Sequence, residues 1–224
     1  NQIRFVTPLF APVVLPMMYQ PPEGFRGKAL VPGDANLMFS GTLARSEAAL
    51  QYFLYAGNGE RTAGGADRNK DKGFGGRIRL SAAGQKIGAS VYSANDDVKS
   101  DPDPLGRRTL YGLDTDLTHG PVNLQAEYAR DKAERREAVF SYYGQLTYTA
   151  AAWTPFVRYE FFKDKGDLLF GRGQSRFSAG TGYAFNNNVI LKGEYHYHRF
   201  RNDEGFMGAP DEIHMFRTAA IFIF

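Results

Sequence analysis

Three side chains that could coordinate a metal ion alternate along the segment EYHYH. Glu194, His196 and His198 occupy every second position, so in an extended strand all three point to the same face. Carboxylate oxygens and imidazole nitrogens are common ligands of transition metals. The alternative is an ordinary polar strand face. We favour that interpretation and expect neither a metal nor another cofactor.

Two further groups of residues could support hydrolysis. Asp114 and Asp116 share one face of a strand, and paired carboxylates can act as general acid and base. A serine nucleophile needs a histidine within hydrogen-bond reach and a third residue that orients it. No serine motif of that kind stands beside His119 or His214, and the absence of cysteine removes thiol chemistry. We therefore expect no catalytic residues and no enzymatic activity.

The elements that position these side chains follow from a sequence period of two. In residues 189–200, Val, Leu, Gly and Tyr alternate with Ile, Lys, Glu and His. The same alternation of apolar and polar residues occurs in residues 74–80, 109–117, 122–128 and 153–161. A helical spacing of apolar residues fits none of these segments well, so the pattern predicts an all-β chain.

Composition restricts the partners of the chain. The 224 residues carry 27 basic and 24 acidic side chains, a net charge of +3, without a basic run. We therefore expect no nucleic-acid partner. The mean hydropathy is −0.40, and no stretch of about 18 apolar residues could form a transmembrane helix.

The connectors between the strands alternate in length. The expected strands begin near Ala35, Ala48, Gly73, Gln85, Arg108, Pro121, Glu137, Trp153, Ser175, Val189 and Glu212. Short connectors cover residues 45–47, 82–84, 119–120, 151–152 and 186–188, and long polar ones cover 58–72, 96–107, 131–136, 163–174 and 202–211. Short turns at one rim and long loops at the other are typical of bacterial outer-membrane barrels. A soluble sandwich has shorter strands, and a lipocalin-like barrel seldom has more than about eight.

We therefore predict an antiparallel transmembrane β-barrel of the bacterial outer membrane. Residues 35–224 would form its strands, short periplasmic turns and long extracellular loops. Residues 1–34 are rich in Pro and Gly, so we expect mostly a loop, folded into or across the barrel mouth. The segment QIRFVTPLFA could form the end of one more strand. Single-chain bacterial barrels have even numbers of strands, so we expect at least about 12 strands. We expect the complete protein to extend beyond this N-terminus.

The apolar C-terminal segment MFRTAAIFIF fits this arrangement. Phe216, Thr218, Ala220, Phe222 and Phe224 would face lipid, with Arg217 on the interior face. In a soluble sheet the same strand would be an aggregation-prone edge. Aromatic residues lie near both rims, as interface girdles require. They are Tyr148, Trp153, Tyr183 and Phe185 beside short turns, and Tyr128, Phe161 and Tyr197 toward long loops.

Alternation also predicts which residues line the interior. The charged ones are Arg77, Arg79, Lys86, Asp114, Asp116, Glu127, Arg158, Glu160, Arg176, Lys192, Glu194 and Arg217. Such a mixed wall with a slight basic excess suits a water-filled channel. In the alternative, the charges pair across strands and plug the lumen. For Arg77 and Arg79, contact with anions and pairing with a neighbouring carboxylate are equally open.

Two segments carry a resemblance to a known family. GKALVPGDANLMFSG, residues 27–41, followed by ALQYFLYAGNGE, residues 49–60, resembles the Gram-negative porins related to the phosphate-selective porins. The resemblance implies a barrel of about sixteen strands, a homotrimer, and diffusion of small anions or other small solutes. It also implies contact with the lipid bilayer and lipopolysaccharide. No lysine cluster of the anion-selective members is found here, so only the class is transferred.

The function expected is that of an outer-membrane porin. Small hydrophilic solutes would diffuse passively through a polar lumen of mixed charge, with a weak preference for anions. The alternative is a non-conducting barrel that acts as a scaffold or sheath for a partner protein. A soluble all-β binding protein is a third possibility, and it would purify without detergent.

Overall fold

The period of two in the sequence becomes eleven β-strands in the computed structural model. The structure describes residues 36–57, 71–95, 106–135, 138–163, 173–186, 189–200 and 212–222. The strands are β1 (Asn36–Arg45), β2 (Ala48–Gly57), β3 (Gly73–Ala82), β4 (Gln85–Asn95), β5 (Arg107–His119), β6 (Val122–Ala133), β7 (Val139–Tyr148), β8 (Trp153–Lys163), β9 (Gly173–Asn186), β10 (Val189–Phe200) and β11 (Glu212–Phe222). Each begins within two residues of the position expected from the sequence.

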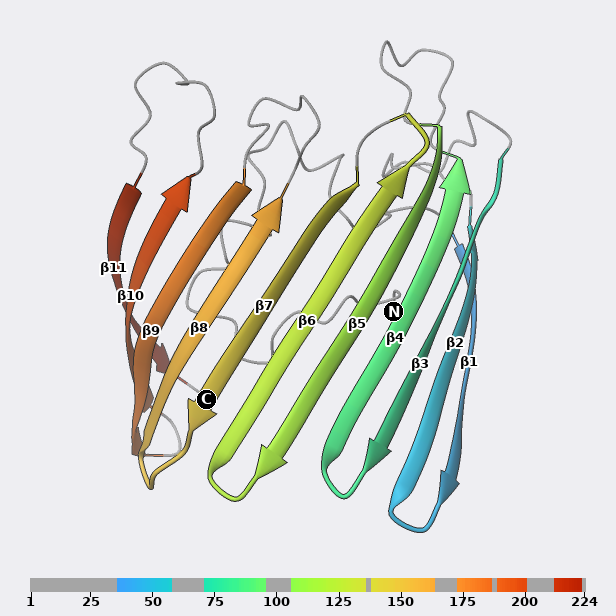
Figure 1. The fold of residues 1–224 in the computed structure, drawn as a ribbon. Helices are drawn as coiled ribbons and strands as arrows, with labels where there is room; N and C mark the ends of the chain where they lie inside the picture. Colours follow the sequence, from blue (N-terminus) through green and yellow to red (C-terminus); the bar gives the residue numbers. More distant parts are fainter. Residues whose placement is uncertain are drawn as a thin grey trace.

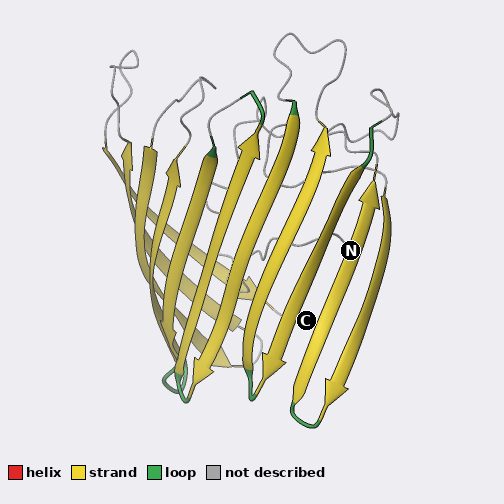
Figure 2. Cartoon of the chain, turned by 45° about the vertical axis from the view of Figure 1, so that its right-hand side comes forward, coloured by secondary structure: helices red, strands yellow, loops and turns green. Residues whose placement is uncertain are grey.

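All eleven strands form one antiparallel sheet in sequence order, from β1 at one edge to β11 at the other. The sheet curls, so it has a convex and a concave face (Figures 1 and 2). Among the described strands, β1 pairs with β2 and β11 pairs with β10. The all-β, antiparallel prediction is confirmed. The additional strand expected within residues 1–34 falls outside the described residues.

Short turns join β1 to β2, β3 to β4, β5 to β6 and β7 to β8 at one end of the sheet (Figure 2), which we call the turn end, and we call the opposite end the loop end. Between β3 and β4, Ala82 pairs with Gln85, which leaves a two-residue turn. Its residues Ala83 and Gly84 have φ angles of 48° and 77°, as a type I′ hairpin requires. This turn type matches the right-handed twist of the flanking strands, so it closes the hairpin without splaying them.

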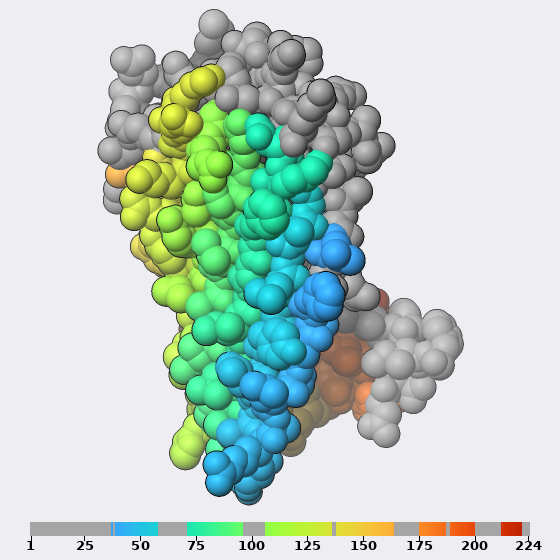
Figure 3. Space-filling view, turned by 90° about the vertical axis from the view of Figure 1, so that its right-hand side faces the viewer, coloured from blue at the N-terminus to red at the C-terminus, as the bar shows by residue number. Residues whose placement is uncertain are grey.

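The distribution of side chains is inverted relative to a soluble domain. Leu37, Phe39, Ile78 and Leu113 are more than half exposed, whereas the other face buries many charged and polar side chains. The side chains of β1 to β6 form one continuous slanted outer surface (Figure 3). A sheet with an apolar convex face and a polar concave face is suited to a lipid environment, because lipid cannot solvate charged side chains. The described part of the chain contains no helix that is long and apolar enough to cross a bilayer.

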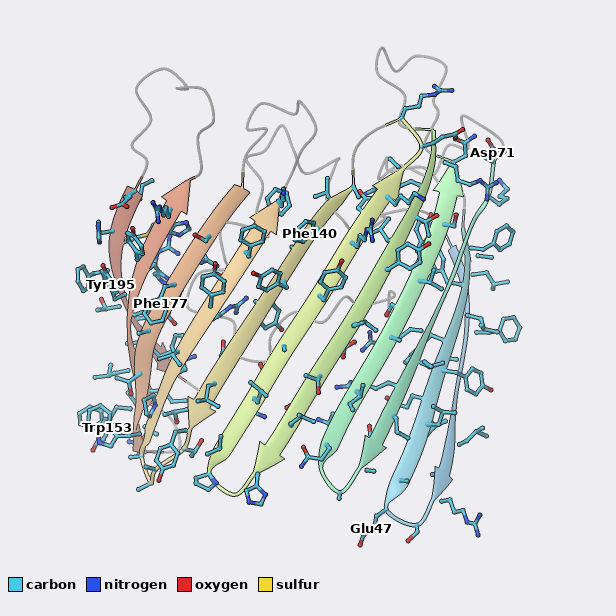
Figure 4. All side chains as sticks on the ribbon, viewed as in Figure 1. Glu47, Asp71, Phe140, Trp153, Phe177 and Tyr195 are labelled. Atoms are coloured by element: carbon cyan, nitrogen blue, oxygen red, sulfur yellow. The ribbon has the colours of Figure 1, made fainter. Side chains whose placement is uncertain are left out.

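Aromatic side chains gather near both ends of the exposed face. Trp153 lies near the turn end, with its ring 4.6 Å from that of Tyr183. Toward the loop end, the rings of Tyr142 and Phe161 stack at 5.3 Å. Figure 4 shows Trp153 projecting from the convex side of the sheet, so the exposed face is the convex one. Such paired bands are what two membrane interfaces favour.

The C-terminal strand follows the expected alternation. Phe216 is 79% exposed on the convex face, and Arg217 is half-buried on the other. Phe224 lies outside the described residues.

Candidate functional site

The concave face carries every charged residue that alternation assigns to the interior. Buried among them are Arg77, Asp114, Glu127, Arg158, Glu160, Arg176 and Glu194. Half-buried are Arg79, Lys86, Asp116, Lys192 and Arg217. Side-chain direction in a strand alternates between odd and even positions. The strand registers keep these residues on one face from β2 to β11, with one register shift where β9 pairs with β10, between Val189 and Ile190.

Arg77 of β3 forms an ion pair with Asp114 of β5, across the intervening strand β4. Its Nη2 donates to Asp114 Oδ1 at 2.8 Å, and its Nη1 lies 2.7 Å from Oδ2. Nη1 also donates to Ser90 Oγ on β4 at 2.8 Å. Gly88 makes this crossing possible, since a Cβ there would lie 2.4 Å from Asp114 Oδ2 and 2.6 Å from Arg77 Nη2. Of the alternatives for Arg77, the structure therefore shows ion pairing.

A second buried group centres on Glu160. Arg158 of the same strand donates from Nη2 to Glu160 Oε1 at 2.6 Å, and Arg176 of β9 binds Glu160 Oε2. The guanidinium carbon of Arg158 lies 4.2 Å from the ring centre of Tyr143 on β7, a cation–π contact. The Nε and Nη1 of Arg158 are buried without a hydrogen-bond partner. One carboxylate thus serves two arginines, which leaves a positive excess.

A third ion pair joins Arg108 of β5 to Asp131 of β6, two residues that are not among the interior residues expected from the sequence. Arg108 Nε donates to both carboxylate oxygens at 2.8 and 2.7 Å, and both side chains are buried. The sequence pattern predicts a connector over residues 131–136, whereas β6 continues to Ala133. Continuing the parity of Glu127 by four residues would have found it.

The histidines on the concave face are close to other polar groups without forming the metal site considered above. Ser178 Oγ lies 2.8 Å from His196 Nδ1, and His196 Nε2 lies 3.2 Å from Glu194 Oε2. This nucleophile, base and carboxylate order is one that catalytic triads share. Catalysis would also need hydrogen-bond donors for an oxyanion. Ser178 and His196 are register partners on β9 and β10, so we interpret their contact as an ordinary cross-strand hydrogen bond. Among the described residues, no cluster of His, Asp and Glu could hold a metal ion.

Asp114 and Asp116 are not a free carboxylate pair. Asp114 is held by Arg77, while Asp116 lies 3.5 Å from Lys86 Nζ and accepts a hydrogen bond of 2.7 Å from Asn123. Both carboxylates therefore form ion pairs or hydrogen bonds with neighbouring strands, which does not favour a role as a general acid and base.

Some charged residues of the wall have no ion-pair partner within the described strands. Arg79 and Arg217 make no ion pair there, and Arg217 Nε contacts the sulfur of Met215 instead. Glu127 also makes none, and its Oε2 is buried without a hydrogen bond. It lies directly opposite Asp114 of β5 and Tyr143 of β7. The unmatched charge on this wall is therefore more positive than negative.

The sheet thus has an apolar convex face and a charged concave face, and the comparison with known families agrees with this arrangement. The sequence profile described as Gram-negative porin matches residues 1–203. The chain belongs to the Gram-negative porin family. The resemblance noted in residues 27–41 and 49–60 is thereby confirmed at the level of the family. No protein of curated function matches this porin well enough to count as a relative.

Solved structures support the fold of this porin. The anion-selective porin from Comamonas acidovorans superposes with a TM-score of 0.56 at 12% sequence identity. The match covers 75% of this chain and 50% of that chain. The porin described here thus spans about half the length of its structural neighbour, and the likeness concerns the fold.

Family membership places the chain in the bacterial outer membrane as part of a β-barrel, as the alternation of turns and loops predicted. It also makes the protein a member of a channel family rather than of an enzyme family.

Proposed function

We propose that this porin lets small hydrophilic solutes diffuse passively across the outer membrane, with a weak preference for anions. The twelve charged residues of the concave wall would line the channel. The observation that carries the proposal is the unmatched charge: within the described strands, Arg79 and Arg217 make no ion pair with a carboxylate, and Glu127 makes none with a cation. The printed name of the Comamonas acidovorans neighbour, an anion-selective porin, is consistent with it.

The size of the expected preference follows from Coulomb's law. A fixed charge about 6 Å from a permeating ion contributes about 0.7 kcal/mol in water, a roughly threefold change in local ion population. Seven basic and five acidic side chains among these twelve leave a net charge of only +2 on the wall, so the selectivity is expected to be weak. Paired arginines such as Arg77 contribute less, because their carboxylates cancel most of the potential.

The test is single-channel recording of the full gene product in a planar bilayer under a salt gradient. Discrete conductance steps with a reversal potential of the anion-selective sign are expected. Arg79→Gln with Arg217→Gln should move the reversal potential toward cation selectivity at nearly unchanged conductance. Arg45→Gln is the matched control, because Arg45 lies on β1 outside the concave wall and should leave the potential unaltered. An unchanged potential in the double variant would refute the assignment of anion preference to these residues.

A folded and inserted barrel that shows no steps would favour the second candidate, a non-conducting scaffold or sheath for a partner protein. We also propose that the porin assembles as a homotrimer and contacts lipopolysaccharide. Cross-linking of the detergent-solubilised protein tests the trimer, with monomer bands alone as the contrary result.

A further inference from the structure

Met215 is a sulfur-bearing residue on the polar concave face of β11. This strand is one edge of the described sheet (Figure 1), and the direct register partner of Met215 is His196 of β10. Arg217 lies two residues along the same face, and both Met215 and Arg217 are half-buried. The thioether is therefore within reach of small solutes on the concave side, unlike that of a methionine that fills an apolar core.

The sulfur of Met215 contacts a cation that no described carboxylate holds. Arg217 Nε donates to Met215 Sδ at 2.8 Å, and Arg217 makes no ion pair with the described residues. A thioether is only a weak hydrogen-bond acceptor, whereas a guanidinium carries several N–H donors. A stronger acceptor on the side chain of Met215 would therefore hold Arg217 more firmly than the sulfur does.

Oxidation turns a thioether into such an acceptor. A lone pair of the sulfur attacks an oxygen of hydrogen peroxide, and the O–O bond breaks. The departing hydroxide then takes the proton of the oxygen that the sulfur has gained, so the products are methionine sulfoxide and water. The sulfur is oxidised and the peroxide is reduced. The sulfoxide is a polar group, with a negative partial charge on its oxygen.

We propose that Met215 is an oxidation site for hydrogen peroxide, and that its sulfoxide binds Arg217 and weakens the anion preference of the wall. The effect on selectivity rests on the function proposed above, in which Arg217 is one of the cations that attract permeating anions. A guanidinium beside the sulfoxide oxygen attracts an anion less, because the partial negative charge cancels part of its potential. Hydrogen peroxide is itself a small hydrophilic solute, so the proposed channel would deliver it to this wall.

Treatment of the folded full gene product with hydrogen peroxide in a non-ionic detergent tests the site, with peptide mass spectrometry as the readout. The peptide that contains Met215 is expected to gain a single oxygen atom. A Met215 that stays unoxidised in the folded protein, under conditions that oxidise it in the urea-unfolded protein, would overturn the proposal. Heat-modifiable mobility on gels shows that the treated protein and each variant are folded.

Salt-gradient recordings before and after this treatment test the effect on Arg217. The ratio of anion to cation permeability should fall in the parent protein by less than about threefold, the effect expected of a full charge. Met215→Leu should keep its ratio after treatment, and Arg217→Gln should begin with a lower ratio that the treatment does not change. Met215→Gln, whose amide oxygen is a stronger acceptor than a thioether, should show the lower ratio without any oxidant.

The controls separate this site from the other methionines and from the proposed function. The chain has five methionines, and Met215→Leu retains all the others, so an equal fall of the ratio in that variant would overturn the assignment to Met215. An oxidised Met215 without a change in the ratio would overturn the binding of Arg217 by the sulfoxide. An untreated parent without anion preference would refute the proposed function and the effect on selectivity, while the mass spectra still decide whether Met215 is the oxidation site.

Discussion

Arg77 and Asp114 are joined by a bidentate ion pair although they lie on strands that are not neighbours. The pair passes over Gly88 of β4, and both side chains are only 7% exposed. It therefore ties three strands together by side chains in addition to their backbone ladders. Bidentate arginine–carboxylate pairs are among the stronger hydrogen-bonded contacts in proteins.

Gly88→Ala should separate this ion pair. The added Cβ would lie 2.4 Å from Asp114 Oδ2, and both ion-pair partners have flexible ends, so the backbone can stay in place while the charges move apart. We expect the barrel to fold but to lose about 2 kcal/mol of unfolding free energy, with a nearly unchanged reversal potential, because Arg77 and Asp114 are freed together and the net charge of the wall stays the same. Urea unfolding in detergent and a salt-gradient recording measure the two effects. Gly144→Ala is the control, because no atom lies within 4 Å of a Cβ there, and an equal loss in it would refute the explanation.

Glu160→Gln and Glu127→Gln should have opposite effects on stability. Glu160 is the common partner of Arg158 and Arg176, so neutralising it leaves two buried cations and should cost about 3–5 kcal/mol. Glu127 faces the like-charged Asp114, and neutralising it should stabilise the fold by about 0.5 kcal/mol. Urea midpoints of the two variants under identical conditions provide the comparison. If both variants were destabilised equally, the assignment of Glu127 as the unmatched carboxylate would be wrong.

Gly180→Ala should prevent the close approach of β9 and β10. A Cβ at this position would lie 2.6 Å from the backbone oxygen of Gly193 and 2.8 Å from a ring carbon of Phe156. Because the backbone oxygen belongs to the sheet and cannot rotate away, we expect a loss of about 3 kcal/mol. Gly182→Ala is the matched control two residues along the same strand, where the nearest atoms lie 3.9 Å away. The folded fraction after detergent refolding measures both, and a normal yield for Gly180→Ala would contradict the prediction.

Ala83→Asn should stabilise the hairpin between β3 and β4. Ala83 has a φ of 48°, a left-handed conformation that costs a residue with a Cβ about 1 kcal/mol and that Asn adopts more readily. We expect the unfolding free energy to rise by up to about 1 kcal/mol without any change in conductance. Ala48→Asn, at the first residue of β2 and the same end of the sheet, should not stabilise the protein. A rise in both variants would point to a general effect of asparagine at this rim.

The sequence alone determined the strands, their faces and their two rims. A strand places alternate side chains on opposite faces, so parity assigned all twelve charged residues to the concave wall before any contact was known. Alternating connector lengths located the turn end, where the type I′ turn at Ala83 and Gly84 is found. The apolar end of the chain predicted the exposed Phe216 for the same reason.

Only the tertiary structure decided which of these charges neutralise one another. Partners are set by the register between strands and by the reach of long side chains, and neither leaves a local signal in the sequence. Arg77 therefore meets Asp114 across Gly88 rather than an immediate neighbour, and Arg108 meets Asp131 at a position that composition had suggested was a loop. Which cations are left without an ion pair among the described residues, as Arg79 and Arg217 are, follows from that pairing. A permeating ion responds to charge that is not neutralised by a partner. The alternation along each strand therefore determines which residues face the concave side, and the register between strands determines the net potential there.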